Sequence, residues 1–491
     1  MIAHSIPVVG FFAITRSSES AFFNKYIKYF LKKAPLLAQI EKKELRSSTM
    51  KRDPKTFYIR TYGCQMNELD TELMMGQLLK RGLTRTDDET AADLLIFNTC
   101  SIRDLAERKV MGKLGQLGML GRIKQRRAVI GVTGCMANAK KESLFRKLPH
   151  VDFVLGTNNI ADLVSVLDEV LETNKPTIRT EDRFEDNLDY IATHREDKVK
   201  AFVSIIRGCD KFCTYCVVPY TRGAEVSRSP DSVLEECRHL ASQGYKEITL
   251  LGQNVNSYGN DQPEWGCKFH DLLYKIDQIE GIERVRFMTS HPVDITKQLM
   301  EAIRDLPSLC EFVHFPLQAG SNRILRKMHR IYTVEQYLEK VQMLREIVPN
   351  VALGTDIIVG FPTETEEDFE ETCRWMKEIR YAVSFIFAYS PRKGTPAMRW
   401  IDDIPEEVKQ KRLQRLLAIH NTIAAEQLQD MLGQEVEVLV ESKQTEGIYL
   451  KSRTRLWQKV IFPGDELLIG SLQRVKIHSC SSQTLVGTLT N

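Results

Sequence analysis

Three cysteines, Cys209, Cys213 and Cys216, lie within eight residues of one another, directly after the apolar run 201–206. Thiols this close together are metal ligands or redox partners, because few other functions need three sulfurs from one loop. Structural zinc would need a fourth Cys or His nearby, and the next histidine, His239, lies well downstream. A redox pair would leave Cys209 unexplained. Three thiolates suit a 4Fe-4S cluster with one iron open to a ligand that is not protein.

Three further cysteines each follow a short apolar run that we predict to be a strand, and a helical pattern follows each of them. This alternation is typical of a small α/β domain with a parallel, Rossmann-like sheet. Ligands of such sheets gather beyond the carboxyl ends of the strands, so these cysteines could meet in space. A single free cysteine is usually a small buried hydrophobe, but three at equivalent positions favour a second metal site. The cysteines are Cys64, Cys100 and Cys135, after the runs Thr56–Thr61, Asp93–Phe97 and Ala128–Val132.

From Ala201 onward, strand and helix patterns alternate six times. They predict a partial (βα)6 barrel, a shortened form of the eight-unit barrel, with its active site at the carboxyl ends of the strands. Polar residues recur at those predicted ends. The strands are expected at 201–206, 247–251, 284–288, 312–315, 351–359 and 383–389.

A helix predicted over 405–432, which we expect to be a solvated bridging helix, ends at Gly433. The apolar period then changes to two, and five short strands predict a small OB-like barrel. Its second and third strands form a basic strip that contains Trp457 and no acid, a composition used to hold RNA backbone and stack bases. The basic residues of this strip, the candidate RNA contacts, are Lys451, Arg453, Arg455 and Lys459.

The composition is that of an ordinary globular protein, with 43% hydrophobic and 27% charged residues in 491. Residues 1–55 carry eleven Lys/Arg and four Asp/Glu, so the net charge of +3 leaves about −4 for the rest. The body is therefore no bulk polycation, and nucleic acid would have to bind local patches. Eleven cysteines fit metal ligation in a reducing compartment, and we expect the protein to be cytoplasmic. No apolar run is long enough for a transmembrane helix.

The domain boundaries follow from these patterns. Residues 1–55 are expected to be a basic extension, either untranslated because synthesis starts at Met50 or disordered; three glutamates weaken the alternative of a mitochondrial transit peptide. Residues 166–200 are expected to be a charged linker, because Asn174-Lys175-Pro176 interrupts the preceding helix. The predicted domains are 56–165, 201–432 and 433–491.

Over nearly all of residues 56–491 the chain resembles the methylthiotransferases, radical S-adenosylmethionine (SAM) enzymes with an N-terminal three-cysteine domain and a C-terminal TRAM domain. The resemblance rests on the segments 62–67 (YGCQMN), 98–103 (NTCSIR) and 216–228 (CVVPYTRGAEVSR). They are most similar to the branch that acts on isopentenylated adenine in tRNA. The ribosomal-protein branch usually has Gly-Cys-Pro-Lys-Asn at the first cysteine, and the threonylcarbamoyl-adenosine branch differs after the third cluster cysteine. Thr133-Gly134-Cys135 departs from the usual Gly-Gly-Cys and keeps the cysteine.

The resemblance implies two 4Fe-4S clusters and SAM as cofactors. Cys209, Cys213 and Cys216 would hold the cluster that cleaves SAM to a 5′-deoxyadenosyl radical, and Cys64, Cys100 and Cys135 would hold an auxiliary cluster. The radical would abstract hydrogen from C2 of N6-isopentenyladenosine at position 37, next to the tRNA anticodon. The auxiliary cluster would supply a methylated sulfur, and a second SAM the methyl group. No side chain is expected as a conventional acid or base, because the C2–H bond is unactivated and the cofactors must carry the chemistry.

The resemblance also implies where SAM binds, at polar residues on the barrel strand ends. The histidines are expected to be hydrogen-bonded structural residues, and the other cysteines packing residues. Glu225 and Arg228 either order the loop after the cluster or contact SAM or tRNA. The expected SAM residues are Gln253, Asn254, Ser290, Gln318 and Asp356; the histidines are His291, His314 and His329; the packing cysteines are Cys237, Cys267, Cys310, Cys373 and Cys480.

The expected partners are tRNA carrying isopentenyladenosine, an electron donor of flavodoxin or ferredoxin type, and a sulfur or cluster donor. We expect a monomer with no membrane partner. Two alternatives keep the chemistry and change the substrate to threonylcarbamoyl-adenosine in tRNA or to a ribosomal protein. A third, from another class, is a zinc-stabilised RNA-binding protein without catalysis.

Overall fold

The computed structural model describes residues 53–490, except 102–103, 125–127, 182–191 and 446. The extension before Asp53, for which we expected a late start codon or disorder, lies outside these residues. No helix within the described ranges is both long and apolar enough to span a bilayer.

The first domain is a parallel sheet of six strands in the order β2-β1-β3-β4-β5-β6. It confirms the predicted parallel α/β domain, and its order is that of flavodoxin-like doubly wound sheets. Strands are added on one side of β1 up to β2 and on the other side from β3 onward. The boundary between β1 and β3 is therefore the switch point at which such sheets bind ligands. The strands are β1 (Thr56–Tyr62), β2 (Thr84–Arg85), β3 (Leu94–Thr99), β4 (Val129–Gly134), β5 (Phe153–Leu155) and β6 (Thr177–Arg179).

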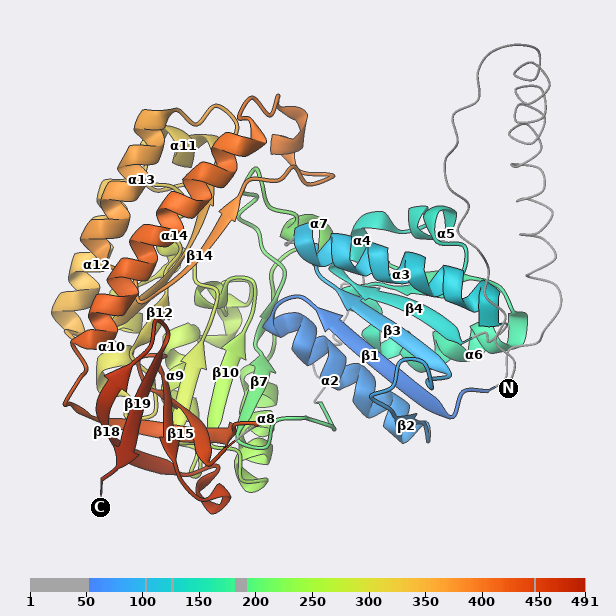
Figure 1. Cartoon of the computed structure of the whole chain (residues 1–491), viewed down its shortest axis with the longest axis horizontal. Coiled ribbons are helices and arrows are strands. Elements are labelled where there is room, and N and C mark those ends of the chain that lie inside the picture. The colour runs from blue at the N-terminus through green and yellow to red at the C-terminus, as the bar shows by residue number, and fades with distance from the viewer. Residues whose placement is uncertain (1–52, 102–103, 125–127, 182–191, 446, 491) are drawn as a thin grey trace, which may run out of the picture. The chain divides into compact units, whose positions relative to one another are not determined.

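Helices cover both faces of this sheet (Figure 1). Apolar side chains of α2 and α6 pack on one face, and those of α3, α4 and α5 on the other. Alternate strand residues face opposite sides, so Leu94 and Ile96 join the first cluster while Leu95 and Phe97 join the second. The helices are α2 (Gln65–Lys80), α3 (Asp104–Lys124), α4 (Cys135–Lys140), α5 (Ser143–Lys147), the 3-10 helix η1 (Thr157–Asp162) and α6 (Leu163–Thr173).

Three strands of the sheet, β2, β5 and β6, were not predicted. Each has only two or three residues, too few to display a period of two. Because β6 pairs with β5, the prediction of a linker over 166–200 is wrong at its start. The end of α6 and all of β6 belong to the sheet domain.

The second domain confirms the partial (βα)6 barrel. Its parallel strands run in two groups, β7-β10-β11 and β12-β13-β14, and a bridge between Val285 and Leu309 joins the groups. One continuous apolar cluster fills the space between these strands and the helices around them. The strands are β7 (Lys200–Ser204), β10 (Glu247–Leu251), β11 (Arg284–Phe287), β12 (Phe312–His314), β13 (Ala352–Val359) and β14 (Val383–Ala388). The helices are α7 (Val218–Thr221), α8 (Pro230–Ser242), α9 (Phe269–Asp277), α10 (Lys297–Asp305), α11 (Asn322–Lys327), α12 (Val334–Ile347) and α13 (Glu366–Ile379), and the short strands β8 (Ile206–Arg207) and β9 (Val226–Ser227) flank the cysteine loop.

Helix α14 (Glu406–Gln429) packs on α13 and β14, so the prediction of a solvated bridging helix is wrong. Its Lys409 and Arg412 are buried and paired with Asp402 and Glu364. A charge pattern read from sequence does not reveal such buried pairs. The closed five-stranded barrel that follows confirms the predicted C-terminal barrel. Its strands are β15 (Glu435–Lys443), β16 (Tyr449–Thr454), β17 (Lys459–Pro463), β18 (Leu472–Cys480) and β19 (Thr484–Leu489).

Candidate cluster sites

The strand register brings the three scattered cysteines together. Tyr62 of β1 pairs with Thr99 of β3, which pairs with Gly134 of β4. Cys100 and Cys135 directly follow two of these paired residues, and Cys64 lies two positions after the third. Neighbouring strands lie about 4.8 Å apart, so the three cysteines stand side by side at the switch point of the sheet.

Tight backbone packing fixes this arrangement. Gly134 has a φ of 88°, and a Cβ atom there would lie 2.5 Å from the carbonyl oxygen of Thr99, so no other residue fits before Cys135. The buried side chain of Asn67 supports the opposite strand end by donating from Nδ2 to Asn98 Oδ1 across 3.1 Å. Its Oδ1 accepts from the backbone N–H of Cys64 at 3.4 Å. The motif around Cys64 therefore serves the geometry of two strand ends.

The surroundings of Cys64 lower the pKa of its thiol, whereas the pKa of Cys135 is raised. A hydrogen bond from Cys100, and next the positive charge of Arg222, lower the pKa of Cys64 to about 5, against the effect of burial. Burial raises the pKa of Cys135, and Arg222 opposes that rise. Thiolates are the form in which cysteine binds metal, so this donor set fits an iron-sulfur cluster.

The second group of cysteines lies in the loop between β8 and α7. Gly208 has a φ of 80°, and a side chain at this position would put its Cβ atom 1.8 Å from the carbonyl oxygen of Ala224. Only glycine therefore fits where the start of the loop passes Ala224. Cys209 donates its N–H to Gly223 O at 3.1 Å, and Cys216 donates to Cys213 O at 3.0 Å. These bonds fold the loop so that its cysteines face one region.

Burial raises the pKa of Cys209 and Cys216 to about 12. Arg330 stabilises negative charge there, because its Nη1 donates to Cys213 Sγ across 3.3 Å. None of the eleven cysteines, all within the described chain, forms a disulfide. No three His, Cys, Asp or Glu side chains in the described ranges are grouped to hold a single metal ion. A cubane cluster does not need its three thiolates to meet at one metal ion, since each thiolate binds a different iron.

The barrel strand ends carry buried polar atoms that have no hydrogen-bond partner among the described residues. Asn254 Oδ1, Ser290 Oγ and both amide atoms of Asn256 are of this kind. Buried polar groups are normally paired, so unpaired ones at these strand ends fit a polar ligand such as SAM. Asn256 was not among the expected SAM residues, although it lies in the same loop as Asn254.

The other expected SAM residues have structural contacts. Gln253 Oε1 accepts from the N–H of Gly208 at 2.5 Å and so holds the cysteine loop. Gln318 is buried with a φ of 73°, and its N–H donates to the carbonyl oxygen of Asp356 at 2.9 Å. Contact of these five residues with SAM stays a prediction.

The histidines only partly match the expectation of hydrogen-bonded structural residues. His291 is buried, and its Nδ1 accepts from Val293 N at 3.4 Å. His329 is exposed at the end of α11, with a φ of 56°. His314 differs: its Nε2 lies 3.4 Å from Asp356 Oδ2, but neither ring nitrogen makes a hydrogen bond within the described part of the chain.

Of the two readings of Arg228, the structure favours loop ordering. Its buried guanidinium pairs with Glu236 and donates to Ser232 Oγ at 2.9 Å. Glu225 is half-buried beside the cysteine loop, where its N–H donates to Asp210 Oδ1 at 3.3 Å. The packing cysteines behave as expected, since Cys237, Cys267, Cys310 and Cys373 are buried and Cys480 is half-buried.

One of the four predicted RNA contacts, Arg455, holds the C-terminal barrel against the larger one, whereas a second, Arg453, pairs within the C-terminal barrel itself. Arg455 pairs with Glu311 at 2.8 Å and donates to the carbonyl oxygens of Pro307 and Leu309. Arg453 pairs with Glu441 at 3.2 Å, and its guanidinium lies 4.5 Å from the ring centroid of Trp457. Only Lys451 and Lys459 of the four are exposed. The basic strip thus divides into a docking side and a solvent side.

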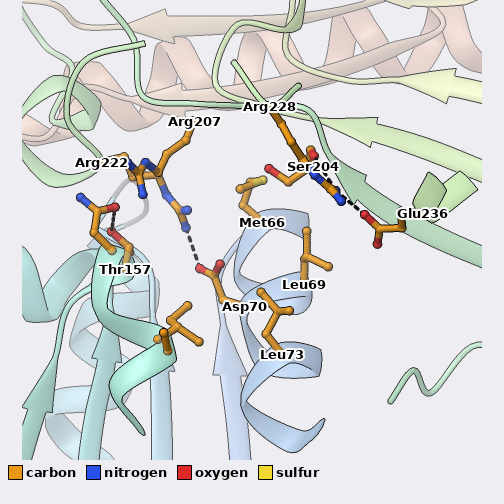
Figure 2. Close-up of a pocket in the computed structure, with 13 residues that line it drawn as sticks. Met66, Leu69, Asp70, Leu73, Thr157, Ser204, Arg207, Arg222, Arg228 and Glu236 are labelled. Carbon is orange, nitrogen blue, oxygen red and sulfur yellow. Dashed lines mark hydrogen bonds and ion pairs between the residues drawn. The ribbon is translucent and has the colours of Figure 1, made fainter. Parts of the chain in front are cut away.

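Sequence reasoning missed Arg330 and the position of Arg222. A cavity of about 80 Å³ lies between the sheet domain and the (βα)6 barrel, with Arg222, Asp70 and Met66 on its wall (Figure 2). Arg222 belongs to the segment 216–228, whose sequence we used to infer the substrate, yet its side chain contacts the sheet domain. Arg330 lies 117 residues beyond Cys213, so no local pattern joins them.

Comparison with known proteins agrees with this geometry. The radical SAM superfamily matches residues 203–376, and the uncharacterized protein family UPF0004 matches residues 56–156. A tRNA-2-methylthio-N(6)-dimethylallyladenosine synthase of Protochlamydia amoebophila is 72% identical over 439 residues, covering 89% of this chain and 97% of that protein. The chain belongs to the family of tRNA-2-methylthio-N(6)-dimethylallyladenosine synthases. A member from Clostridium botulinum (strain Loch Maree) is 48% identical over 436 residues, covering 88% and 96%, and one from Thermoanaerobacter pseudethanolicus is 46% identical over 436 residues, covering 88% and 92%.

Methylthiotransferases of this family use SAM and two 4Fe-4S clusters. Among solved structures, the radical SAM methyltransferase TsrM from Kitasatospora setae, with cobalamin and a 4Fe-4S cluster bound, matches with a TM-score of 0.53. At 14% identity over 70% of this chain and 77% of that one, the likeness concerns the fold alone.

Proposed function

We propose that this protein methylthiolates C2 of N6-isopentenyladenosine at position 37 of tRNA, consuming two SAM molecules. One observation carries the proposal: the register of β1, β3 and β4 brings Cys64, Cys100 and Cys135 side by side, and the segment after Cys216 is bonded to Asn138 and Asp70 of the helices that follow Cys135 and Cys64. Two cysteine sites joined by this segment suit a reaction in which one site activates the substrate and the other supplies sulfur.

Cys209, Cys213 and Cys216 would hold the cluster that binds SAM, and its chemistry when bound is reductive cleavage of SAM. Other residues of the chain hold the cysteine loop in place. Gln253 and Gly223 hold the loop, and Arg330 balances the charge of Cys213. The unpaired atoms of Asn254, Asn256 and Ser290 would bind the polar groups of SAM.

Cys64, Cys100 and Cys135 would hold the auxiliary cluster, whose chemistry when bound is delivery of a methylated sulfur. The sheet excludes water from this side, since Cys100 and Cys135 are buried. The deprotonated form of Cys64 is favoured before any metal binds.

The remaining partners follow from this reaction. The C-terminal barrel would act as a TRAM domain that binds tRNA backbone through Lys451 and Lys459, which are exposed. An electron donor of flavodoxin or ferredoxin type would reduce the first cluster, and a sulfur or cluster donor would restore the second. We expect a cytoplasmic monomer.

Nucleoside mass spectrometry of tRNA tests the substrate. A strain that lacks this gene should accumulate isopentenyladenosine, and a plasmid copy should restore the 2-methylthio derivative. A plasmid copy carrying Cys237→Ala, at a buried cysteine outside both sites, should restore it as well. Persistence of 2-methylthio-isopentenyladenosine in the deletion strain would overturn this substrate assignment.

A further inference from the structure

Arg222 lies at the junction of the two cysteine sites. It follows Cys216 by six residues, yet its Nη2 pairs with Asp70 Oδ2 of α2 across 2.8 Å. Both side chains are almost fully buried, with 5% and 7% of their surface exposed. Figure 2 shows the guanidinium reaching from the barrel loop down to this helix. Two segments 152 residues apart are thus joined by one ion pair.

The backbone beside Arg222 is also held by the sheet domain. The carbonyl oxygen of Thr221 accepts from Asn138 Nδ2 at 2.5 Å and from Thr157 Oγ1 at 3.0 Å. Asn138 belongs to α4, the short helix that begins at Cys135. The guanidinium therefore has little freedom to leave the region between α2 and α4.

The charge of Arg222 acts on the auxiliary thiols. Its guanidinium hydrogen-bonds to Cys135, the first residue of α4, and Asn138 of the same helix holds the carbonyl oxygen of Thr221. A guanidinium keeps its charge in any case and has five N–H donors, so it can serve a carboxylate and a thiolate together.

We propose that Arg222 is a positioning residue of the auxiliary cluster, which fixes the cluster beside the Cys209–Cys216 loop and stabilises its reduced, more negative state. The proposal rests on the proposed role of Cys64, Cys100 and Cys135 as cluster ligands. Net charge and hydrogen bonds to the sulfurs are the means by which a protein sets the potential of such a cluster. Arg222 supplies a cation at the site, and Asp70 moderates it.

The plain alternative is that Arg222 only joins two domains, and the chain offers a matched control. Arg195, with 2% of its side chain exposed, pairs with Glu72 of α2 at 3.0 Å and with Glu236 of α8 at 2.6 Å. It links the same two domains by a buried ion pair, but its hydrogen bonds go to Glu72, Glu236 and the carbonyl oxygen of Phe202 and not to a cysteine. A purely structural role predicts that Arg222 and Arg195 variants behave alike.

The test is a redox titration of the auxiliary cluster alone, followed by electron paramagnetic resonance. The parent protein is full-length and carries Cys209→Ala, Cys213→Ala and Cys216→Ala; after anaerobic reconstitution it should bind about four irons. We expect Arg222→Gln to lower the midpoint potential and Arg222→Lys to stay close to the parent. Asp70→Asn should raise the potential, because it removes a negative charge. Arg195→Gln should lower the melting temperature and leave the potential unchanged.

Opposite shifts in the Arg222 and Asp70 variants cannot arise from loosened packing, which would act on both in the same way. If Arg222→Gln holds no cluster, the Asp70→Asn and Arg222→Lys proteins decide the question. Equal potentials in Arg222→Gln, Asp70→Asn and the parent would overturn the role of Arg222 and leave the proposed function standing. A parent protein that binds no iron would overturn the ligand assignment itself.

Discussion

Arg330 donates a hydrogen bond from Nη1 to the Sγ atom of Cys213 across 3.3 Å, from beneath the cysteine loop. The guanidinium is buried, its Nε donates to Tyr332 OH at 3.0 Å, and its carbon lies 5.1 Å from the ring centroid of Tyr332. A cationic donor fixed in this way stabilises a thiolate and any negative charge that the thiolate shares.

Replacing this donor should slow SAM cleavage. A hydrogen bond to a charged group contributes about 1.5–3 kcal/mol, so Arg330→Leu should reduce the rate of 5′-deoxyadenosine formation about tenfold or more. Chromatographic assay of 5′-deoxyadenosine with a chemical reductant measures this rate. Arg326→Gln, at an exposed position on α11, is the control and should keep the parental rate. A normal rate in Arg330→Leu would mean that the bond has no part in the reaction.

The docking of the C-terminal barrel should depend on Arg286. Its Nε pairs with Glu247 at 2.9 Å, while Nη1 and Nη2 donate to the carbonyl oxygens of Arg455 and Thr454. Arg286→Met would leave Glu247 buried without its partner, which costs about 3–5 kcal/mol. We expect a lower melting temperature by calorimetry, with partial recovery in Arg286→Met/Glu247→Leu. An unchanged melting temperature in the single variant would refute this account of docking.

Binding of tRNA should depend on the solvent side of the basic strip. Lys451→Ala/Lys459→Ala removes two candidate phosphate contacts, so affinity should fall and the slope of log K against log salt should become shallower by about 1.5. Fluorescence anisotropy at several salt concentrations measures both. The matched double variant Lys411→Ala/Lys393→Ala changes two exposed lysines of the (βα)6 barrel domain and should leave the slope unchanged. If both double variants change the salt slope equally, the basic strip is not the specific binding surface for tRNA.

The buried His291 should make stability fall in acid. Burial first, and then Arg330, Lys211 and Lys340, lower its pKa to about 2. The unfolded chain binds this proton near pH 6.5, so the contribution of neutral His291 is complete above that pH and is lost as the pH falls. Between pH 6 and pH 5 the unfolding free energy of the parent should drop about 1.2 kcal/mol more than that of His291→Gln. Denaturant titrations at the two pH values would contradict this if both proteins lose stability equally.

The sequence predicts most of the arrangement that positions the cysteines. Periodicity marks the longer strands, and the rule that ligands gather at strand ends is enough to bring Cys64, Cys100 and Cys135 together from their places in the chain. The strands β5 and β6 escape prediction because three residues carry no period. Their omission leads to the wrong linker boundary.

Long-range side-chain pairing is the part that sequence does not reveal. Composition alone suggests that Arg453 and Arg455 bind RNA, because it cannot tell that Arg453 pairs with Glu441 of the neighbouring strand and Arg455 with Glu311 of the other barrel. Arg222 and Arg330 reach partners more than one hundred residues away. Such pairs depend on how whole domains pack, and no local spacing encodes them.

The most direct test of the two-site account is one reaction in which two products are measured together. Reconstituted Cys100→Ala protein, supplied with SAM, a reductant and isopentenylated tRNA, should still form 5′-deoxyadenosine but no 2-methylthio-isopentenyladenosine. Cys209→Ala should form neither, and Cys373→Ala, at a buried packing cysteine, should form both. Mass spectrometry quantifies both products from the same sample. Methylthiolated nucleoside from the Cys100→Ala protein would contradict the assignment of an auxiliary sulfur-donating site to Cys64, Cys100 and Cys135.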